Sequence, residues 1–149
     1  MLIIGYPGIG KSTLAYENNN FVDLDSTAFY HKGGRIDNWY VYYCRIAYEL
    51  SKQGFNVFIS SHECVVNYIK KHFNDEKILC VFPGMDAKDA WIYRLRKRLE
   101  MHKSEFNARA LNFVLNNFDS SINFLMNCGL EYVTVDELSN LEDIIEKYK

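Results

Sequence analysis

Short apolar runs alternate with longer segments of mixed polarity along the whole chain. Most of the apolar runs are uninterrupted and rich in Ile, Val, Leu and Phe, which is typical of strands buried on both faces of a sheet. Between them, apolar residues recur at helical spacing, as at Tyr42, Ile46 and Leu50. The predicted strands are 2–4, 21–25, 56–60, 78–82 and 131–135, and the predicted helices are 12–17, 38–52, 63–73, 86–102, 108–127 and 138–148.

This alternation of strand and helix predicts the fold class. Strands separated by helices pair in parallel, and right-handed crossovers place the helices on both faces of the sheet. We therefore expect an α/β fold: a three-layer α/β/α doubly wound sandwich with a five-stranded parallel sheet. A length of 149 residues without a linker predicts one domain over 1–149. Ligands of such sheets bind at the carboxyl ends of the strands.

Composition and charge exclude several classes of protein. The net charge is −2, so the chain has no overall attraction to nucleic acid or to anionic lipid. No apolar run reaches the length that a membrane span needs, so we expect no membrane association. The four cysteines form no paired motif, which disfavours a zinc site and suggests free thiols in a cytoplasmic protein. No feature of the sequence indicates a protein partner.

One motif carries specific chemistry. The segment from Gly5 to Ser12 matches the phosphate-binding pattern G-x-x-x-x-G-K-[ST] in full, between a predicted strand and a predicted helix. Its glycines allow backbone N–H groups to converge on phosphate oxygens. Lys11 is expected to reach the outer phosphates, the Ser12 hydroxyl to bind Mg²⁺, and Thr13 to contact an inner phosphate. The alternative is a glycine-rich turn without a ligand. The predicted nucleotide contacts are Gly5, Gly8, Ile9, Gly10, Lys11, Ser12 and Thr13.

Two carboxylates end the second predicted strand. Asp23 and Asp25 lie two residues apart, so on an extended strand both project to one side, where the phosphates are expected. One could organise Mg²⁺ and its waters, and the other could accept a proton from the group that attacks the outermost phosphate. Alternatively, Asp25 caps a turn or helix and Asp23 is merely solvated.

Further polar residues follow at the same expected edge of the sheet. The glycine-containing loop 31–35 could bring Arg35 to a ligand, and the third strand ends in Ser60, Ser61 and His62. That strand lacks the terminal carboxylate of a motor ATPase, which leaves Mg²⁺ to the preceding aspartates. His62 is a candidate for contact with the acceptor of the phosphoryl group, or it is a capping or surface residue.

A basic helix supplies the remaining candidates. Arg94 and Arg98 lie four residues apart and therefore share one face, whereas Arg96 points elsewhere. That spacing suggests a clamp for phosphate. The alternative is a basic helix end that complements its own dipole.

The phosphate loop followed by the acidic pair resembles the shikimate and gluconate kinase group of small P-loop phosphotransferases, and polynucleotide 5′-kinases and nucleotide kinases share this layout. The resemblance implies that Asp23 serves Mg²⁺ and Asp25 the acceptor. It also implies that Ser61 and His62 lie among the acceptor contacts. Arg94 and Arg98 would belong to a lid that folds over the nucleotide.

The expected function is a small kinase that uses ATP and Mg²⁺. Its catalytic residues would be Lys11, Asp25, Arg94 and Arg98. A nucleoside, a nucleotide, a nucleic-acid end or another small molecule would suit this layout as acceptor. The positive charge of the loop and lid favours one of the first three. Two alternatives remain: a regulatory module that binds ATP without catalysis, and a simple nucleotide hydrolase.

Overall fold

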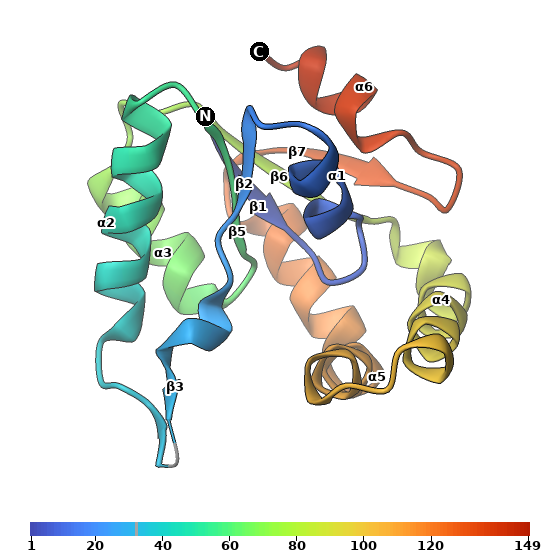
Figure 1. Cartoon of the computed structure of the whole chain (residues 1–149). Coiled ribbons are helices and arrows are strands. Elements are labelled where there is room, and N and C mark those ends of the chain that lie inside the picture. Colours follow the sequence, from blue (N-terminus) through green and yellow to red (C-terminus); the bar gives the residue numbers. More distant parts are fainter. Residues whose placement is uncertain (32) are drawn as a thin grey trace.

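The computed structural model describes residues 1–31 and 33–149, and Lys32, within the predicted loop 31–35, lies outside the described residues. A parallel sheet runs through the middle of the molecule between helices (Figure 1). Its strands are β1 (Leu2–Gly5), β2 (Phe21–Asp23), β5 (Asn56–Ser60), β6 (Ile78–Pro83) and β7 (Glu131–Val135). The helices are α1 (Lys11–Glu17), α2 (Trp39–Lys52), α3 (Glu63–His72), α4 (Lys88–Met101), α5 (Glu105–Asn127) and α6 (Leu141–Glu146).

The strand order places the phosphate loop at the centre of the sheet. The order is β2-β5-β1-β6-β7, and all four neighbouring pairs are parallel. The chain thus builds the sheet first to one side of β1 and then to the other. Helices α1 and α6 cover one face, and α2 and α3 cover the opposite face (Figure 1). The expected five-stranded doubly wound sandwich is confirmed, and the loop after β1 lies at the point where the strand order reverses, the usual ligand site of such sheets.

Burial on both faces explains the apolar runs. Leu2, Ile3 and Ile4 in β1 are fully buried, and so are Val57, Phe58 and Ile59 in β5. Side chains on alternate faces of these strands meet helices above and below, so the middle positions of these strands are apolar. Among the helices of the described residues, none combines the length and the apolar character that crossing a bilayer requires.

The second strand is shorter than predicted. Strand β2 ends at Asp23, and Asp25 is the N-terminal cap of a 3₁₀ helix, η1 (Ser26–Phe29). The prediction that both aspartates lie on one extended strand is therefore wrong. The carboxylate of Asp25 accepts a hydrogen bond from the backbone N–H of Thr27, and this local bond turns the chain away from the sheet.

Other boundaries differ for similar local reasons. The predicted loop 31–35 contains parts of two short antiparallel strands, β3 (Tyr30–His31) and β4 (Gly34–Arg35). Helix α5 begins at Glu105, earlier than expected, because the Ser104 hydroxyl caps it by accepting from the N–H of Asn107. A short 3₁₀ helix, η2 (Met85–Ala87), precedes α4.

Candidate functional site

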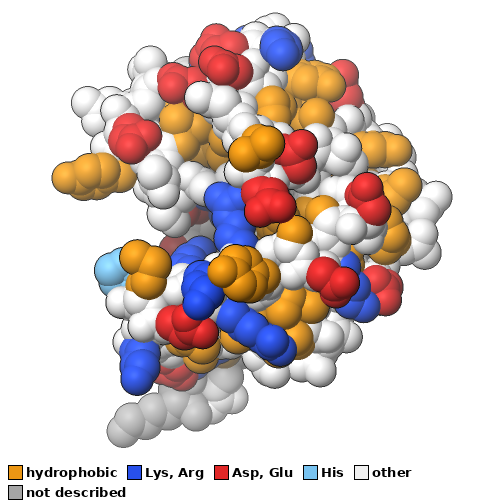
Figure 2. All heavy atoms as spheres, turned by 90° about the vertical axis from the view of Figure 1, so that its right-hand side faces the viewer, with side chains coloured by type: hydrophobic (Ala, Val, Ile, Leu, Met, Phe, Trp, Pro, Cys, Tyr) orange, Lys and Arg blue, Asp and Glu red, His pale blue; other side chains and the backbone are white. Residues whose placement is uncertain are grey.

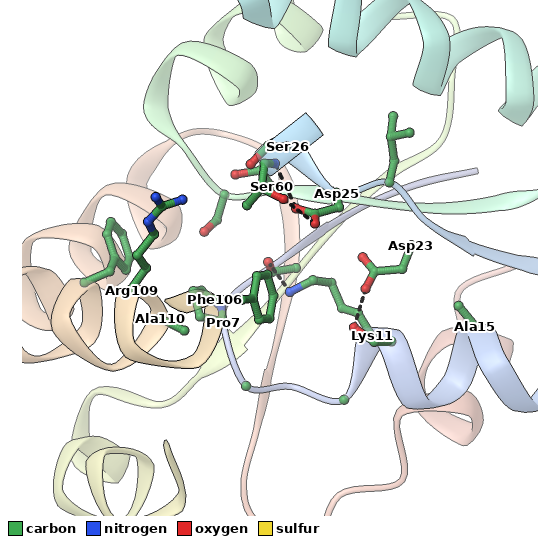
Figure 3. A pocket seen from close by; sticks show the side chains of 18 of the residues that line it. Pro7, Lys11, Ala15, Asp23, Asp25, Ser26, Ser60, Phe106, Arg109 and Ala110 are labelled. Carbon is green, nitrogen blue, oxygen red and sulfur yellow. Dashed lines mark hydrogen bonds between the residues drawn. The ribbon is translucent and has the colours of Figure 1, made fainter. Parts of the chain in front are cut away.

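A large cavity opens at the carboxyl ends of β1, β2 and β5, with a volume of about 1200 Å³. Its wall combines the phosphate loop, the segment after β2, the end of β5, and helices α4 and α5. Lys11 and the two aspartates reach it from the sheet side, and Arg109 reaches it from α5 (Figure 3). The structure brings together these predicted site residues: Gly5, Gly8, Gly10, Lys11, Ser12, Thr13, Asp23, Asp25, Arg35, Ser61, His62, Arg94 and Arg98. Ile9 is the exception, because its side chain is buried in the core.

The phosphate loop has the backbone shape that its glycines predict. Gly8 and Gly10 have φ angles of 88° and 100°, in the left-handed region that other residues rarely adopt. Helix α1 follows directly, and no side chain caps its first turn. The N–H groups of Lys11, Ser12 and Thr13 in that turn have no partner within the helix, because helical bonding begins four residues on. They are available to an anion.

Lys11 lies folded over the loop. Its ammonium donates hydrogen bonds to the carbonyl oxygens of Gly5 at 3.0 Å and Tyr6 at 2.9 Å. The pKa of Lys11 is lowered to about 8, mainly by burial; Asp23 opposes this shift and Arg98 contributes to it. A phosphate bound beside the ammonium would favour its charged form.

Ser12 and Asp23 form a pair of oxygen donors at the cavity wall. The Ser12 hydroxyl donates to Oδ2 of Asp23 at 2.5 Å, so the two oxygens are already close together. Hydroxyl and carboxylate oxygens suit Mg²⁺, which keeps several waters and needs few protein ligands. Within residues 1–31 and 33–149, no cluster of three or more His, Cys, Asp or Glu side chains could hold a metal by itself. The pair therefore fits a Mg²⁺ ion whose remaining ligands are phosphate oxygens and waters.

The position of Asp25 is fixed from two sides. Its Oδ2 accepts from the Thr27 hydroxyl at 2.5 Å, in addition to the cap bond from the Thr27 N–H. The preceding residue, Leu24, accepts at its carbonyl from the hydroxyl of Tyr43 at 2.7 Å, and the same hydroxyl accepts from the N–H of Ser60 at 2.8 Å. Tyr43 thus ties the end of β2 to the end of β5. Asp25 caps η1 and also lines the cavity, so its two interpretations are compatible.

Arg35 and His62 form a hydrogen-bonded network. The guanidinium of Arg35 contacts Nε2 of His62 at 3.1 Å and donates to the Ser26 hydroxyl at 3.1 Å. A guanidinium only donates, so Nε2 of His62 accepts and Nδ1 carries the proton, which it shares with the Ser60 hydroxyl. Burial, together with Arg35, lowers the pKa of His62 to about 4. His62 is therefore neutral at neutral pH, and both of its nitrogens are occupied.

A second arginine beside Arg35 in the acceptor region, Arg109, was not expected from the sequence. Tyr30 lies between two guanidinium groups, with Arg35 4.5 Å and Arg109 4.6 Å from its ring centroid. Arg35 also packs over the Trp39 ring at 4.2 Å, and its buried Nε has no hydrogen-bond partner within the described chain. Arg109 belongs to no motif, and its helical face could not be identified without knowing how α5 packs. Glu105 lies four residues before Arg109 on the same helix and pairs with it. That spacing is typical of an exposed helix face and does not indicate a binding site.

The two predicted lid arginines both face the cavity. Arg94 and Arg98 line it from α4, whereas Arg96 lines a separate shallow hollow with Leu111. Burial is the main cause that lowers the pKa of Arg98, and the neighbouring Arg94 adds to it. On the face shown in Figure 2, Lys and Arg side chains gather around a hollow in the middle of the molecule. This concentration of positive charge is local, since the net charge of the chain is −2.

Comparison with known proteins supports the fold. The sequence matches no protein-family model and no curated protein. The structure is similar to the 1.7 Å crystal structure of a shikimate kinase from Bacteroides thetaiotaomicron, with 18% sequence identity and a TM-score of 0.52. The match covers 99% of this chain and 92% of that chain. The chain thus shares its fold with that kinase.

Proposed function

We propose that this protein is a kinase that transfers the γ-phosphoryl group of ATP, with Mg²⁺, to an acceptor in the same cavity. The observation that carries the proposal is the shared wall: the phosphate loop and a second group of polar side chains around Asp25 open into one space of about 1200 Å³. That volume exceeds the usual size of a site for one small molecule, which leaves room for two substrates. A protein that only bound a nucleotide would not need the second group.

The residues divide into roles by position. The loop N–H groups and Lys11 would bind the phosphates of ATP, and Ser12 with Asp23 would hold Mg²⁺, which when bound would neutralise charge on the outer phosphates. Asp25 would orient an acceptor hydroxyl and accept its proton. The acceptor oxygen would form a bond to the γ-phosphorus while the bond from that phosphorus to the β-phosphate oxygen breaks, which releases ADP.

Arg94 and Arg98 would stabilise the negative charge of the phosphoryl group in transit and exclude water from it. Their placement on the cavity side of α4 supports this role. Exclusion of water favours transfer to an acceptor over hydrolysis.

The acceptor would be a nucleoside, a nucleotide or a nucleic-acid end, and it would be phosphorylated on a hydroxyl or a phosphate group. Arg35 and Arg109, on either side of Tyr30, offer two cations to this part of the cavity. Guanidinium groups bind phosphate and carboxylate oxygens with paired hydrogen bonds. The free thiols of all four cysteines are consistent with a cytoplasmic protein.

The test is ATP consumption in the presence of Mg²⁺ against a panel of nucleosides, nucleotides and oligonucleotide ends, with products identified by mass. A product heavier by one phosphoryl group, absent with Lys11→Met, would support the kinase and name its acceptor. Tight ATP binding without transfer would favour a regulatory nucleotide-binding module instead. Phosphate release at the same rate with and without every acceptor would favour a hydrolase.

A further inference from the structure

The indole of Trp91 lies against the phosphate loop. Trp91 is on α4, has 1% of its surface exposed, and is not part of the cavity wall in the described chain. Its Nε1 donates a hydrogen bond of 2.8 Å to the carbonyl oxygen of Pro7, the second residue after the end of β1. A buried indole N–H normally has a partner, but here the partner is the backbone of the functional loop.

This bond fixes the direction of one peptide group. No peptide bond in the described chain is cis. In a trans peptide, the carbonyl and the following N–H lie in one plane and point in opposite directions. The Pro7 carbonyl points to Trp91, so the N–H of Gly8 points away from Trp91. Gly8 itself lines the cavity. The indole therefore orients a donor of the loop towards the space where phosphates are expected.

The packing around Gly8 is equally tight. A Cβ atom at Gly8 would lie 3.1 Å from Nε1 of Trp91 and 3.1 Å from Cδ2 of Leu95. These two side chains hold α4 directly against the loop. The same helix carries Arg94, whose guanidinium lies 5.1 Å from the centroid of the Trp91 ring, and Arg98. Any shift of the loop is thus transmitted to the arginines, because close-packed interfaces do not deform continuously.

We propose that Trp91 is a positioning residue for phosphate binding: it orients the N–H of Gly8 and keeps the arginines of α4 in register with the loop. The inference rests on the proposed binding of nucleotide at this loop. Nothing in the phosphate-loop motif requires a tryptophan on a helix so distant in the sequence. The role belongs to this chain's own packing.

The first test replaces Trp91 by Phe, which keeps an aromatic ring but removes the N–H donor. The affinity for Mg·ADP is measured by calorimetry, because ADP binds without turnover. We expect the dissociation constant to rise about tenfold, the effect of weakening one hydrogen bond to a charged group. Tyr93→Phe is the matched control, since Tyr93 is exposed on the same helix. The affinity of this variant for Mg·ADP should stay at the wild-type value.

The outcomes separate the two proposals. If the wild-type protein binds no Mg·ADP, the proposed function fails and this inference fails with it. If the wild type binds and a folded Trp91→Phe protein binds equally well, only the positioning role is overturned. If Trp91 had only a structural role, Trp91→Phe would lower the melting temperature but leave the affinity of the folded protein for Mg·ADP unchanged.

A spectroscopic test does not require any change at Trp91. The chain has two tryptophans, so Trp39→Phe leaves Trp91 as the sole indole emitter. Saturation with Mg·ADP should shift or quench the emission of Trp91. The reason is that the charged phosphates would bind to the loop that the indole contacts. Emission that does not change at saturation, with binding shown by calorimetry, would overturn the proposal.

Discussion

The hydroxyl of Ser12 and the carboxylate of Asp23 are joined by a hydrogen bond of 2.5 Å, although they lie 11 residues apart on different elements. Ser12 is in the first turn of α1, and Asp23 is the last residue of β2. The pair is therefore assembled by the packing of α1 against β2, and it presents two oxygens side by side at the mouth of the phosphate loop. This arrangement supports the proposed Mg²⁺ site.

Asp23→Asn tests that site. The amide keeps the size of the side chain but removes the negative charge that would attract Mg²⁺ and its waters. We expect the Mg²⁺ concentration for half-maximal activity to rise about tenfold or more, as for other residues that support a metal. Titration of activity with Mg²⁺ at saturating ATP measures the change. Asp75→Asn, at a surface pair with Lys52, is the control and should leave the titration unaltered. An identical titration for Asp23→Asn would remove this residue from the metal site.

Asp25→Asn separates chemistry from folding. An asparagine can still accept the capping hydrogen bond from the N–H of Thr27, so η1 should remain intact. We expect turnover to fall by about a hundredfold or more, because an amide cannot accept the proton, while ATP affinity changes by less than about twofold. Single-turnover kinetics and calorimetry measure the two quantities. Unaltered turnover would mean that Asp25 acts only as a cap.

The arginines of α4 allow a matched comparison on one helix. Arg98 lines the cavity and Arg96 faces a separate hollow. Replacement of Arg98 by Met should lower kcat by roughly a hundredfold or more, since an arginine that stabilises a transferring phosphoryl group contributes strongly. Arg96→Met should stay within about twofold of the wild type. Equal effects of the two replacements, measured as kcat at saturating substrates, would contradict a specific role for Arg98.

His62 should make stability depend on pH. Its pKa is lowered to about 4 in the folded protein, mainly by burial, from an ordinary value of 6.5. Between these values the unfolded chain binds a proton at His62 and the folded protein does not, so the free energy of unfolding decreases as the pH falls from 6.5 to 4. Above pH 6.5 the imidazole is neutral in both states, and the effect disappears.

Urea unfolding across this pH range measures the contribution. The wild type should lose about 1–3 kcal/mol more stability than His62→Gln between pH 6.5 and 4, because glutamine does not titrate. The carboxylates titrate in both proteins and cancel in the comparison. Parallel curves for the two proteins would show that His62 is protonated equally easily in the folded and unfolded states.

Local sequence was sufficient for most of the fold. The five strands, their parallel pairing and the sandwich follow from apolar runs that alternate with helical segments. Two of the boundaries that failed depend on single caps. Asp25 bonds to Thr27 and ends β2 early, and Ser104 starts α5 early. Such caps use the same polar residues that occur in loops, so the pattern by itself could not place them.

The sequence by itself determined the phosphate loop, because its chemistry is local: glycine backbone angles, a lysine and a hydroxyl within one short segment. The tertiary structure alone decided what surrounds that loop. It placed Arg109 of α5 across Tyr30 from Arg35, and it placed Trp91 of α4 on the carbonyl of Pro7. The physical reason is that periodicity shows which residues share a helix face. Which face meets which neighbour depends on packing between segments distant in the chain.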